Sequence, residues 1–190
     1  MMQDTLGGGF RDTARDSARA FRLLMEALAR PGTIQRLNGA TPPEGLSPAA
    51  GTALLTLADG TTPVFLAGAS DSPALRSWIA FHIGAPLCGP EQAMFAIGPF
   101  AALLPHLAAL SPGEPAYPDR SATVIAEVDC LSTEGHRLTG PGIKGEARLS
   151  LPDAVPFRNN ARRFPLGFDS FLTCGDRIAA LPRTTRVEDF

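Results

Sequence analysis

Three turns rich in glycine and proline, all in the last third of the chain, restrict the folds that this sequence can adopt. They are residues 138–143 (Leu-Thr-Gly-Pro-Gly-Ile), 164–169 (Phe-Pro-Leu-Gly-Phe-Asp) and 181–185 (Leu-Pro-Arg-Thr-Thr). Gly140 and Gly142 flank Pro141, so the backbone there can take φ values closed to other residues and can approach another group closely. Apolar residues accompany the turns. This pattern predicts turns seated in the body of a domain rather than ordinary surface loops.

Length and composition indicate one domain over residues 1–190, with a loose lead-in at residues 1–10. A chain of 190 residues is most simply a single domain, and its apolar fraction of 44% is enough for a substantial core. The three cysteines, Cys88, Cys130 and Cys174, are far apart and have no CxxC spacing. Their odd number and their spacing argue against both a disulfide framework and a zinc site.

Charge and hydropathy restrict the binding partners that the protein can have and indicate its cellular compartment. The formal net charge is −2 and no basic stripe is visible, which argues against nucleic acid as a partner. No apolar run reaches the roughly 18–20 residues that a membrane span needs. The N-terminus lacks a basic region followed by an apolar stretch, so no secretory signal is visible. These observations predict a protein of a reducing, bacterial-type cytoplasm.

Helical spacing and capping signals predict five helices, over residues 12–29, 48–57, 73–83, 100–110 and 156–163. Ser-Pro pairs at residues 47–48 and 72–73 place a capping hydroxyl before a proline at the first helical position. We expect the fourth helix to be irregular before Pro105, because proline removes a backbone donor. The first helix has an apolar face that we expect to point into the core, formed by Ala18, Phe21, Met25 and Leu28.

Short apolar segments bounded by turn residues predict the strands. They are residues 33–37, 63–66, 94–98, 122–128, 137–139, 146–151, 170–174 and 177–181, with a tight turn at Gly175-Asp176 joining the last two. The early strands are apolar on both faces, as strands are when both sides of a sheet are covered. The expected fold class is therefore α/β, a three-layer α/β/α sandwich around a mixed sheet with antiparallel pairing late in the chain.

A search for catalytic, metal and cofactor motifs finds none. Neither the GxGxxG nor the GxxxxGK[ST] fingerprint is present, and the glycines at residues 7–9 follow no strand. The histidines His82, His106 and His136 are scattered without metal-ligand spacing. The cysteines could act as nucleophiles only beside a base, and small buried side chains are the alternative. We therefore expect no catalytic residue, no metal and no cofactor.

Two arginine segments are candidates for binding an anion. Arg183, Thr184 and Thr185 combine a guanidinium with hydroxyl donors, which suits phosphate or carboxylate. The alternative is that Arg183 holds the C-terminal segment onto the body through an acid such as Asp169. Arg162-Arg163 could likewise hold a phosphate or a partner's carboxylate, or could be a solvated helix end.

The turns also carry a resemblance to a known family. The ordered segments are 21–27 (Phe-Arg-Leu-Leu-Met-Glu-Ala), 30–32 (Arg-Pro-Gly), 55–59 (Leu-Thr-Leu-Ala-Asp), 62–64 (Thr-Pro-Val), 140–143 (Gly-Pro-Gly-Ile), 164–169 (Phe-Pro-Leu-Gly-Phe-Asp) and 181–185 (Leu-Pro-Arg-Thr-Thr). In this order they resemble the PhnH family, a subunit of the phosphonate carbon–phosphorus (C–P) lyase system. The resemblance runs from about residue 10 to residue 187.

The resemblance implies a bacterial pathway that removes phosphorus from alkylphosphonates. In that family the isolated subunit forms a homodimer and joins PhnG, PhnI and PhnJ in a core complex. PhnG, PhnH and PhnI, with the ATPase-like PhnL, are associated with displacing adenine from ATP by methylphosphonate. The product is α-D-ribose 1-methylphosphonate 5-triphosphate, and PhnJ later cleaves the C–P bond by radical chemistry.

The resemblance also implies a fold like a trimmed large domain of pyridoxal-phosphate-dependent transferases. We expect no such cofactor here, since fold likeness alone does not carry function. Pyridoxal phosphate needs a lysine and an acid for its pyridine nitrogen. Lys144 is the only lysine, and no phosphate-cradling helix start accompanies it.

Two hypotheses for function follow, which differ in what the turns do. In the first, the chain is a structural subunit that docks in the phosphonate-activating complex and has no activity alone. In the second, a phosphate or phosphonate pocket is formed by Arg183, Thr184 and Thr185, with Asp169 and the amides of Gly140 and Gly142. A third hypothesis is an unrelated α/β protein in which the turns are only structural.

Overall fold

The computed structural model describes residues 7–188, which form a mixed α/β fold around a six-stranded sheet with the strand order β1-β10-β9-β6-β3-β2. Four strands are parallel: β2 (Val64–Leu66), β3 (Phe95–Pro99), β6 (Thr123–Glu127) and β9 (Asp169–Cys174). Two antiparallel strands, β10 (Arg177–Leu181) and β1 (Gln35–Arg36), complete the other edge. The mixed sheet and its late antiparallel pairing are as predicted. Gly175, at φ +62°, forms the predicted tight turn between β9 and β10.

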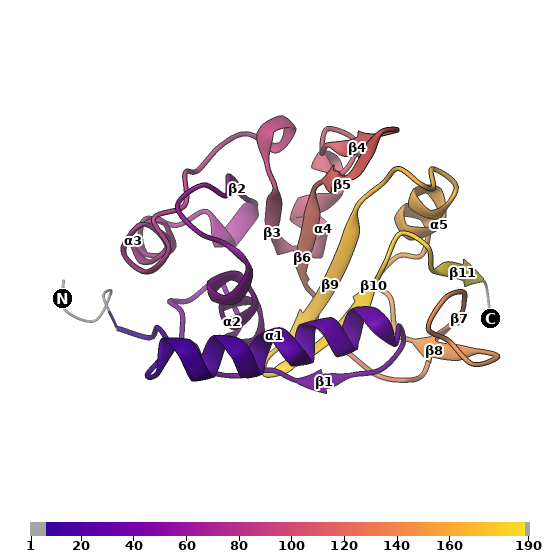
Figure 1. The fold of residues 1–190 in the computed structure, drawn as a ribbon, viewed down its shortest axis with the longest axis horizontal. Coiled ribbons are helices and arrows are strands. Elements are labelled where there is room, and N and C mark those ends of the chain that lie inside the picture. Colours follow the sequence, from indigo (N-terminus) through magenta and orange to yellow (C-terminus); the bar gives the residue numbers. More distant parts are fainter. Residues whose placement is uncertain (1–6, 189–190) are drawn as a thin grey trace.

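Apolar side chains on both faces of the sheet build two cores. On one face, Ile97, Ile125 and Phe171 pack with α1 (Thr13–Ala29), α2 (Pro48–Leu57) and α3 (Pro73–His82). On the other, the neighbouring residues Ala96, Val124 and Leu172 pack with α4 (Phe100–Leu103) and α5 (Val155–Ala161). Successive strand residues point to opposite faces, so the apolar runs noted in the sequence produce a sheet with helices on either side (Figure 1).

Side-chain caps set the starts of the three longest helices. The side chains of Asp12, Ser47 and Ser72 each accept a hydrogen bond of 3.2 Å from the backbone amide three residues ahead. These bonds satisfy amides that have no partner within the helix. The capping signals at Ser47 and Ser72 therefore located α2 and α3 correctly, and the cap at Asp12 was not predicted.

The buried face of α1 is not the one that the sequence predicted. Ala20, Leu24 and Ala27 are buried, whereas Phe21 and Met25 are 48% and 47% exposed. The helix packs against α2 and the β10 side of the sheet through its smaller residues. Of the predicted apolar face, Ala18, Phe21 and Met25 lie on the outside, whereas Leu28 is half-buried against the core, because α1 has apolar residues on more than one side.

The segment after β3 also differs from the prediction. The expected helix over residues 100–110 ends at Leu103 and gives way to the 3-10 turn η4 (Leu104–His106). The irregularity expected before Pro105 is confirmed, but the helix is shorter than predicted. A hairpin that the sequence did not reveal follows, made of β4 (Pro112–Glu114) and β5 (Tyr117–Ser121). Two further 3-10 turns are η2 (Gly68–Ser70) and η3 (Pro90–Gln92).

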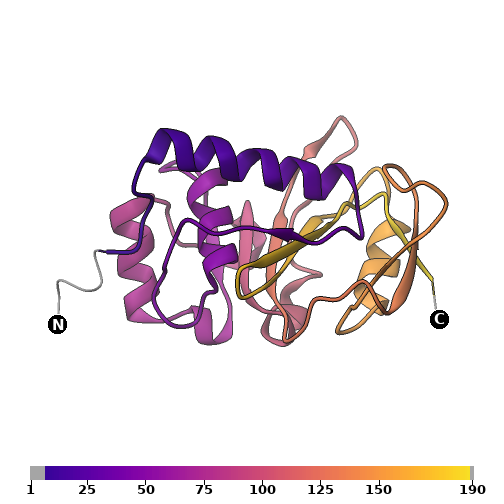
Figure 2. The ribbon, with the colours of Figure 1, turned by 90° about the horizontal axis from the view of Figure 1, so that it is seen from below.

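A separate three-stranded sheet lies beside α5. It contains β7 (His136–Thr139), β8 (Ala147–Leu149) and the unpredicted β11 (Arg186–Glu188), in the order β11-β7-β8. In both ribbon views this sheet and α5 lie at the end of the molecule opposite α3 (Figures 1 and 2). It supplies Leu138, Leu149 and Val187 to the second core.

Residues 7–10 are held against the body, which corrects the expectation of a loose lead-in for this part; residues 1–6 lie outside the described chain. The Gly7 carbonyl accepts a 3.1 Å hydrogen bond from Trp78 Nε1, and the Gly8 carbonyl accepts one of 2.8 Å from the Thr41 amide. No helix in the described part of the chain is long and apolar enough to cross a membrane.

Candidate functional site

The three glycine- and proline-rich turns converge at the end of α1, although the last begins about forty residues after the first. A Cβ on Gly142, at φ +81°, would overlap the carbonyl oxygen of Ala29. A Cβ on Gly140 would lie 3.0 Å from the carbonyl oxygen of Thr184. The first turn is therefore inserted between the end of α1 and the third turn. We call residues 139–142, 164–169 and 182–185 the turn junction.

Arg183 is the centre of the turn junction. Its Nε and Nη2 donate to the two Asp169 carboxylate oxygens at 3.2 and 2.6 Å, and its backbone amide donates to Oδ1 at 2.9 Å. Nη1 donates to the Pro118 carbonyl at 2.7 Å, and Nη2 also donates to the Ser121 hydroxyl. Only 11% of the Arg183 side chain is exposed. The guanidinium thus joins the third turn to β9 and to the β4–β5 hairpin.

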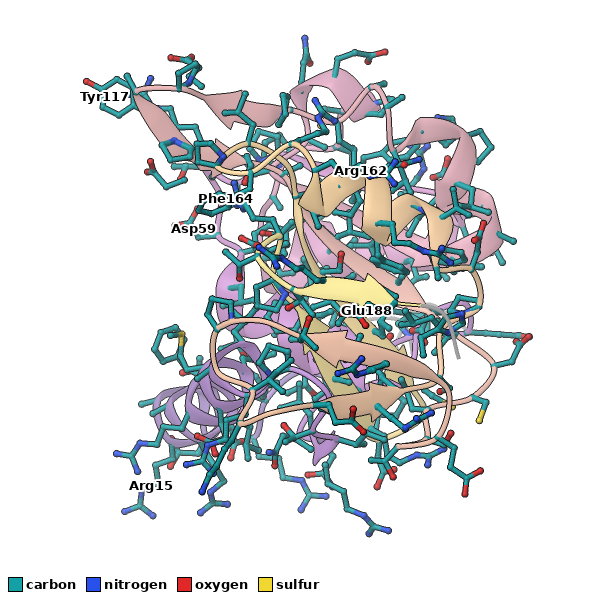
Figure 3. All side chains as sticks on the ribbon, turned by 90° about the vertical axis from the view of Figure 1, so that its right-hand side faces the viewer. Arg15, Asp59, Tyr117, Arg162, Phe164 and Glu188 are labelled. Carbon is teal, nitrogen blue, oxygen red and sulfur yellow. The ribbon has the colours of Figure 1, made fainter. Side chains whose placement is uncertain are left out.

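The second turn is clamped from α5 by a buried amide. Asn160 accepts a hydrogen bond from the Phe168 amide at 2.9 Å and donates one to the Phe168 carbonyl at 2.7 Å. The Gly167 amide donates to the Pro112 carbonyl at 2.9 Å. Phe164, which precedes the cis peptide bond to Pro165, remains 61% exposed on this rigid support. Figure 3 shows Phe164 and Arg162 on neighbouring parts of the same end of the molecule.

Two hollows lie on either side of the turn junction. One, of about 460 Å³, is lined by Thr139, Gly140, Pro141, Ala161, Phe164, Thr184 and Arg186. The other, of about 400 Å³, is lined by Met25, Leu28, Ala29, Pro141, Gly142, Asp169, Pro182 and Thr184. Pro141 and Thr184 border both hollows and form the ridge between them.

All six predicted ligand residues lie in the turn junction, but they do not all face open space. Thr184 faces both hollows, whereas Thr185 is buried and its hydroxyl oxygen has no hydrogen-bond partner among residues 7–188. Arg183 and Asp169 are bound to each other, which is the pairing that the alternative interpretation named. Ligand binding by these residues stays a prediction. Asn160 and Ser121 were missed, because isolated polar residues carry no sequence signal for a contact with a distant turn.

The turn junction lies at the amino ends of the parallel strands. Asp169 is the first residue of β9 and pairs with Thr123, the first residue of β6. Open α/β sheets generally bind ligands at the opposite edge, beyond the carboxyl ends of the strands. There the start of α2 is already occupied, since Glu127 Oε1 accepts from the Ser47 amide at 2.6 Å. The arrangement does not reproduce a phosphate site at a helix N-terminus.

The residues do not fit pyridoxal phosphate. Lys144 is exposed in the loop between β7 and β8, next to Gly145, around which a Cβ would meet nothing within 4 Å. An imine-forming lysine needs an enclosed site with an acid facing the cofactor's pyridine nitrogen. Among the described residues there is also no group of three metal-ligating side chains.

The cysteines differ in their expected reactivity. Burial raises the pKa of the Cys88 thiol, so a smaller fraction is thiolate near neutral pH, and Cys130 is exposed. Since the thiolate is the nucleophile, Cys130 should be alkylated before Cys88 in the folded protein. Timed iodoacetamide labelling with peptide mass spectrometry measures this order, and unfolding in urea should abolish the difference. Faster labelling of Cys88 would contradict its burial.

The chain is a mixed α/β domain. Its best candidate for binding an anion, Arg183, is paired with Asp169 of the same chain. Comparison with known proteins is specific: the family model of bacterial phosphonate metabolism proteins (PhnH) matches residues 8–188. The chain belongs to the PhnH family, as its ordered motifs predicted.

Two relatives extend the match over most of the chain. The alpha-D-ribose 1-methylphosphonate 5-triphosphate synthase subunit PhnH of Rhizobium meliloti (strain 1021) is 39% identical over 190 residues, covering 95% of this chain and 94% of the relative. The putative C-P lyase subunit protein HtxG of Stutzerimonas stutzeri is 33% identical over 177 residues, covering 88% and 84%. Both are named as subunits, in accord with the subunit function predicted from the motifs.

Proposed function

We propose that the chain is a subunit of the assembly that forms α-D-ribose 1-methylphosphonate 5-triphosphate from ATP and methylphosphonate. The names of the two relatives support this assignment. Its partners in the proposal are the PhnG, PhnI and PhnJ subunits, it is a homodimer when isolated, and it acts in the cytoplasm. Its sheet would be a reduced form of the pyridoxal-phosphate transferase large domain, without the cofactor. It contributes surface and rigidity and has no activity alone.

The observation that carries this proposal is the internal use of Arg183. A cation that binds phosphate must donate hydrogen bonds to the ligand. The guanidinium of Arg183 already donates hydrogen bonds to Asp169, Pro118 and Ser121. Its contacts join three segments that are distant in the sequence. Such a residue stabilises a surface, and the turns around it then present Phe164, Pro141 and Thr184 in fixed positions.

A ligand-binding subunit is the second candidate, and one observation favours it. Arg186 lines the 460 Å³ hollow with Thr184, and it forms no ion pair with any residue between 7 and 188. A guanidinium and a hydroxyl beside a hollow can bind a phosphonate or phosphate group. In this alternative the hollow, rather than Arg183 itself, receives the anion.

Reconstitution separates the two candidates. The chain would be purified alone and with the PhnG and PhnI homologues of its own genome, sized by chromatography with light scattering, and assayed for adenine release from ATP and methylphosphonate. We expect a dimer without activity when alone, and a stable co-complex whose activity requires this chain. Calorimetric titration of the isolated chain with ATP or methylphosphonate should show no binding. Binding that disappears in Thr184→Val, or adenine release by the chain alone, would overturn the proposal.

A further inference from the structure

The outer face of α1 carries an apolar stripe that is exposed except at its last residue, Leu28, which is half-buried against the core. It consists of Ala14, Ala18, Phe21, Met25 and Leu28, spaced by four, three, four and three residues. This is the spacing of apolar residues along the seam between two packed helices. Phe21 and Met25 leave about half of their side chains exposed, at 48% and 47%. We call these five residues the α1 stripe.

Of the α1 stripe, Leu28 packs against the core, and the other four residues are not needed to hold α1 on the domain. Ala20, Leu24 and Ala27 already bury the inner face of the helix, and Asp12 caps its start. Both ribbon views show α1 along the outside of the molecule (Figures 1 and 2). An apolar stripe that remains outside after the core is complete indicates a surface for another protein.

One side of the α1 stripe is positively charged. Arg15, Arg19 and Arg22 follow one another along this side at helical spacing, and the row ends at Glu26, which Arg30 binds at 3.0 Å. Arg15 has only a 3.6 Å contact with Asp12 and is 85% exposed, and Figure 3 shows it pointing away from the body. Arg19 and Arg22 form no ion pair with any residue between 7 and 188. This side therefore favours carboxylates on whatever covers the stripe.

The C-terminal end of the α1 stripe opens into the turn junction. Met25 and Leu28 line the 400 Å³ hollow together with Pro141, Pro182 and Thr184. A side chain from a helix lying on the stripe could therefore insert between α1 and the turns. The stripe, its arginine side and the hollow form one continuous surface. The turns of the turn junction form one wall of the hollow in this surface.

We propose that this surface binds an amphipathic helix of a partner subunit. The partner's apolar face covers the α1 stripe, one apolar side chain enters the 400 Å³ hollow, and its Glu or Asp residues face Arg15, Arg19 and Arg22. The inference rests on the proposed function, since it names the partner chemistry of a docking subunit.

Charge disfavours a second copy of this chain as the occupant. Parallel pairing of two α1 helices would set each arginine beside the same arginine of the copy. Antiparallel pairing centred between Phe21 and Met25 would bring Arg22 near its own copy and Arg15 near Arg30 of the other chain. Arg19 would lie near Glu26 of the copy, a carboxylate that Arg30 of its own chain already binds at 3.0 Å. Like charges at such positions are destabilising.

Substitutions on the exposed stripe test the proposal without removing core residues. The double variant F21S/M25S should bind the reconstituted PhnG–PhnI–PhnJ assembly about tenfold or more weakly, with an unchanged Tm. The control is Phe81→Ser on α3, a phenylalanine that is 59% exposed, and it should bind as wild type does. Arg22→Glu should slow association and reduce its salt dependence, whereas Arg148→Glu on β8 should not. Equal binding by wild type and F21S/M25S would overturn the proposal.

A model peptide separates this inference from the proposed function. The probe is a helical peptide of about three heptads with Leu at the seam positions and Glu beside them, compared with the same peptide carrying Lys. We expect wild type to bind only the Glu peptide and F21S/M25S to bind neither. If the chain binds the Glu peptide but not the assembly, the proposed function is wrong and the inference stands. If the stripe variants bind the assembly as wild type does, the inference is wrong and the proposed function stands. A wild-type dimer that F21S/M25S dissociates would assign the stripe to a second copy and overturn the inference.

Discussion

Gly142→Ala is expected to lower the free energy of unfolding by about 3 kcal/mol, because the alanine would have a left-handed φ and its Cβ would clash with backbone. At φ +81° an added Cβ would overlap the carbonyl oxygen of Ala29 and lie 3.1 Å from the Pro31 ring. The carbonyl belongs to the end of α1 and cannot move aside as a flexible side chain could. The first turn must therefore shift away from the helix. Urea unfolding followed by circular dichroism measures the change.

Gly145 provides a matched control for Gly142. Its φ of +80° is nearly the same, but a Cβ there would meet nothing within 4 Å. Gly145→Ala should therefore show only the conformational cost, roughly 1 kcal/mol. The difference between the two variants isolates the close packing of the turn on α1. If both substitutions lower the free energy of unfolding by the same amount, the first turn does not pack closely against α1.

Asp169→Ala is expected to lower the free energy of unfolding by about 2–3 kcal/mol. The substitution leaves the largely buried guanidinium of Arg183 without its carboxylate and removes three hydrogen bonds. The expected loss is below that for a fully buried pair, because the Asp169 side chain is 31% exposed. Urea unfolding of the single variants Asp169→Ala and Arg183→Met and of the double variant measures the coupling between them.

The pair Arg76–Asp71 is the control for Arg183–Asp169. This pair is also bidentate: Arg76 Nε and Nη2 donate to Asp71 Oδ1 and Oδ2 at 2.6 and 2.8 Å. The Arg76 and Asp71 side chains, however, are 54% and 37% exposed. Asp71→Ala should change stability little, because exposed ion pairs are screened by water. A loss in Asp169→Ala no greater than in Asp71→Ala would mean that Arg183 is free to bind a ligand, which would favour the alternative function.

These two predictions also bear on how activity data are interpreted. Gly142 and Asp169 line the 400 Å³ hollow, so a destabilised turn junction would weaken docking indirectly. Loss of complex formation in such variants must be compared with their stability before it is assigned to contact. F21S/M25S avoids this ambiguity, because both residues are exposed and lie outside the core.

Much of the local structure could be predicted from the sequence. The sequence predicts the caps at Ser47 and Ser72, the apolar runs of the parallel strands and the turn at Gly175, and the structure contains all of them. Each depends on interactions among residues within a few positions of one another. The family was predicted from the order of short motifs, and the family match over residues 8–188 confirmed it.

Several features depend on contacts between distant segments, and local patterns did not reveal them. The β4–β5 hairpin and β11 have no strong alternation, and the helix predicted after β3 stops where the chain must turn. The engagement of Arg183 with Asp169 and Pro118 joins residues that are 14 and 65 positions apart. The sequence could name the Asp169 pairing only as one of two alternatives.

Helix α1 shows where the two kinds of information separate. Its existence, its cap and its apolar stripe follow from residues 12–29 alone, because helix formation and periodicity are local properties. Which side faces the sheet depends on fit against α2 and β10, and there the smaller Ala20 and Ala27 pack with Leu24 while Phe21 and Met25 remain outside. Local pattern therefore determined the elements, whereas their long-range packing decided which apolar surface was buried and which was left for a partner.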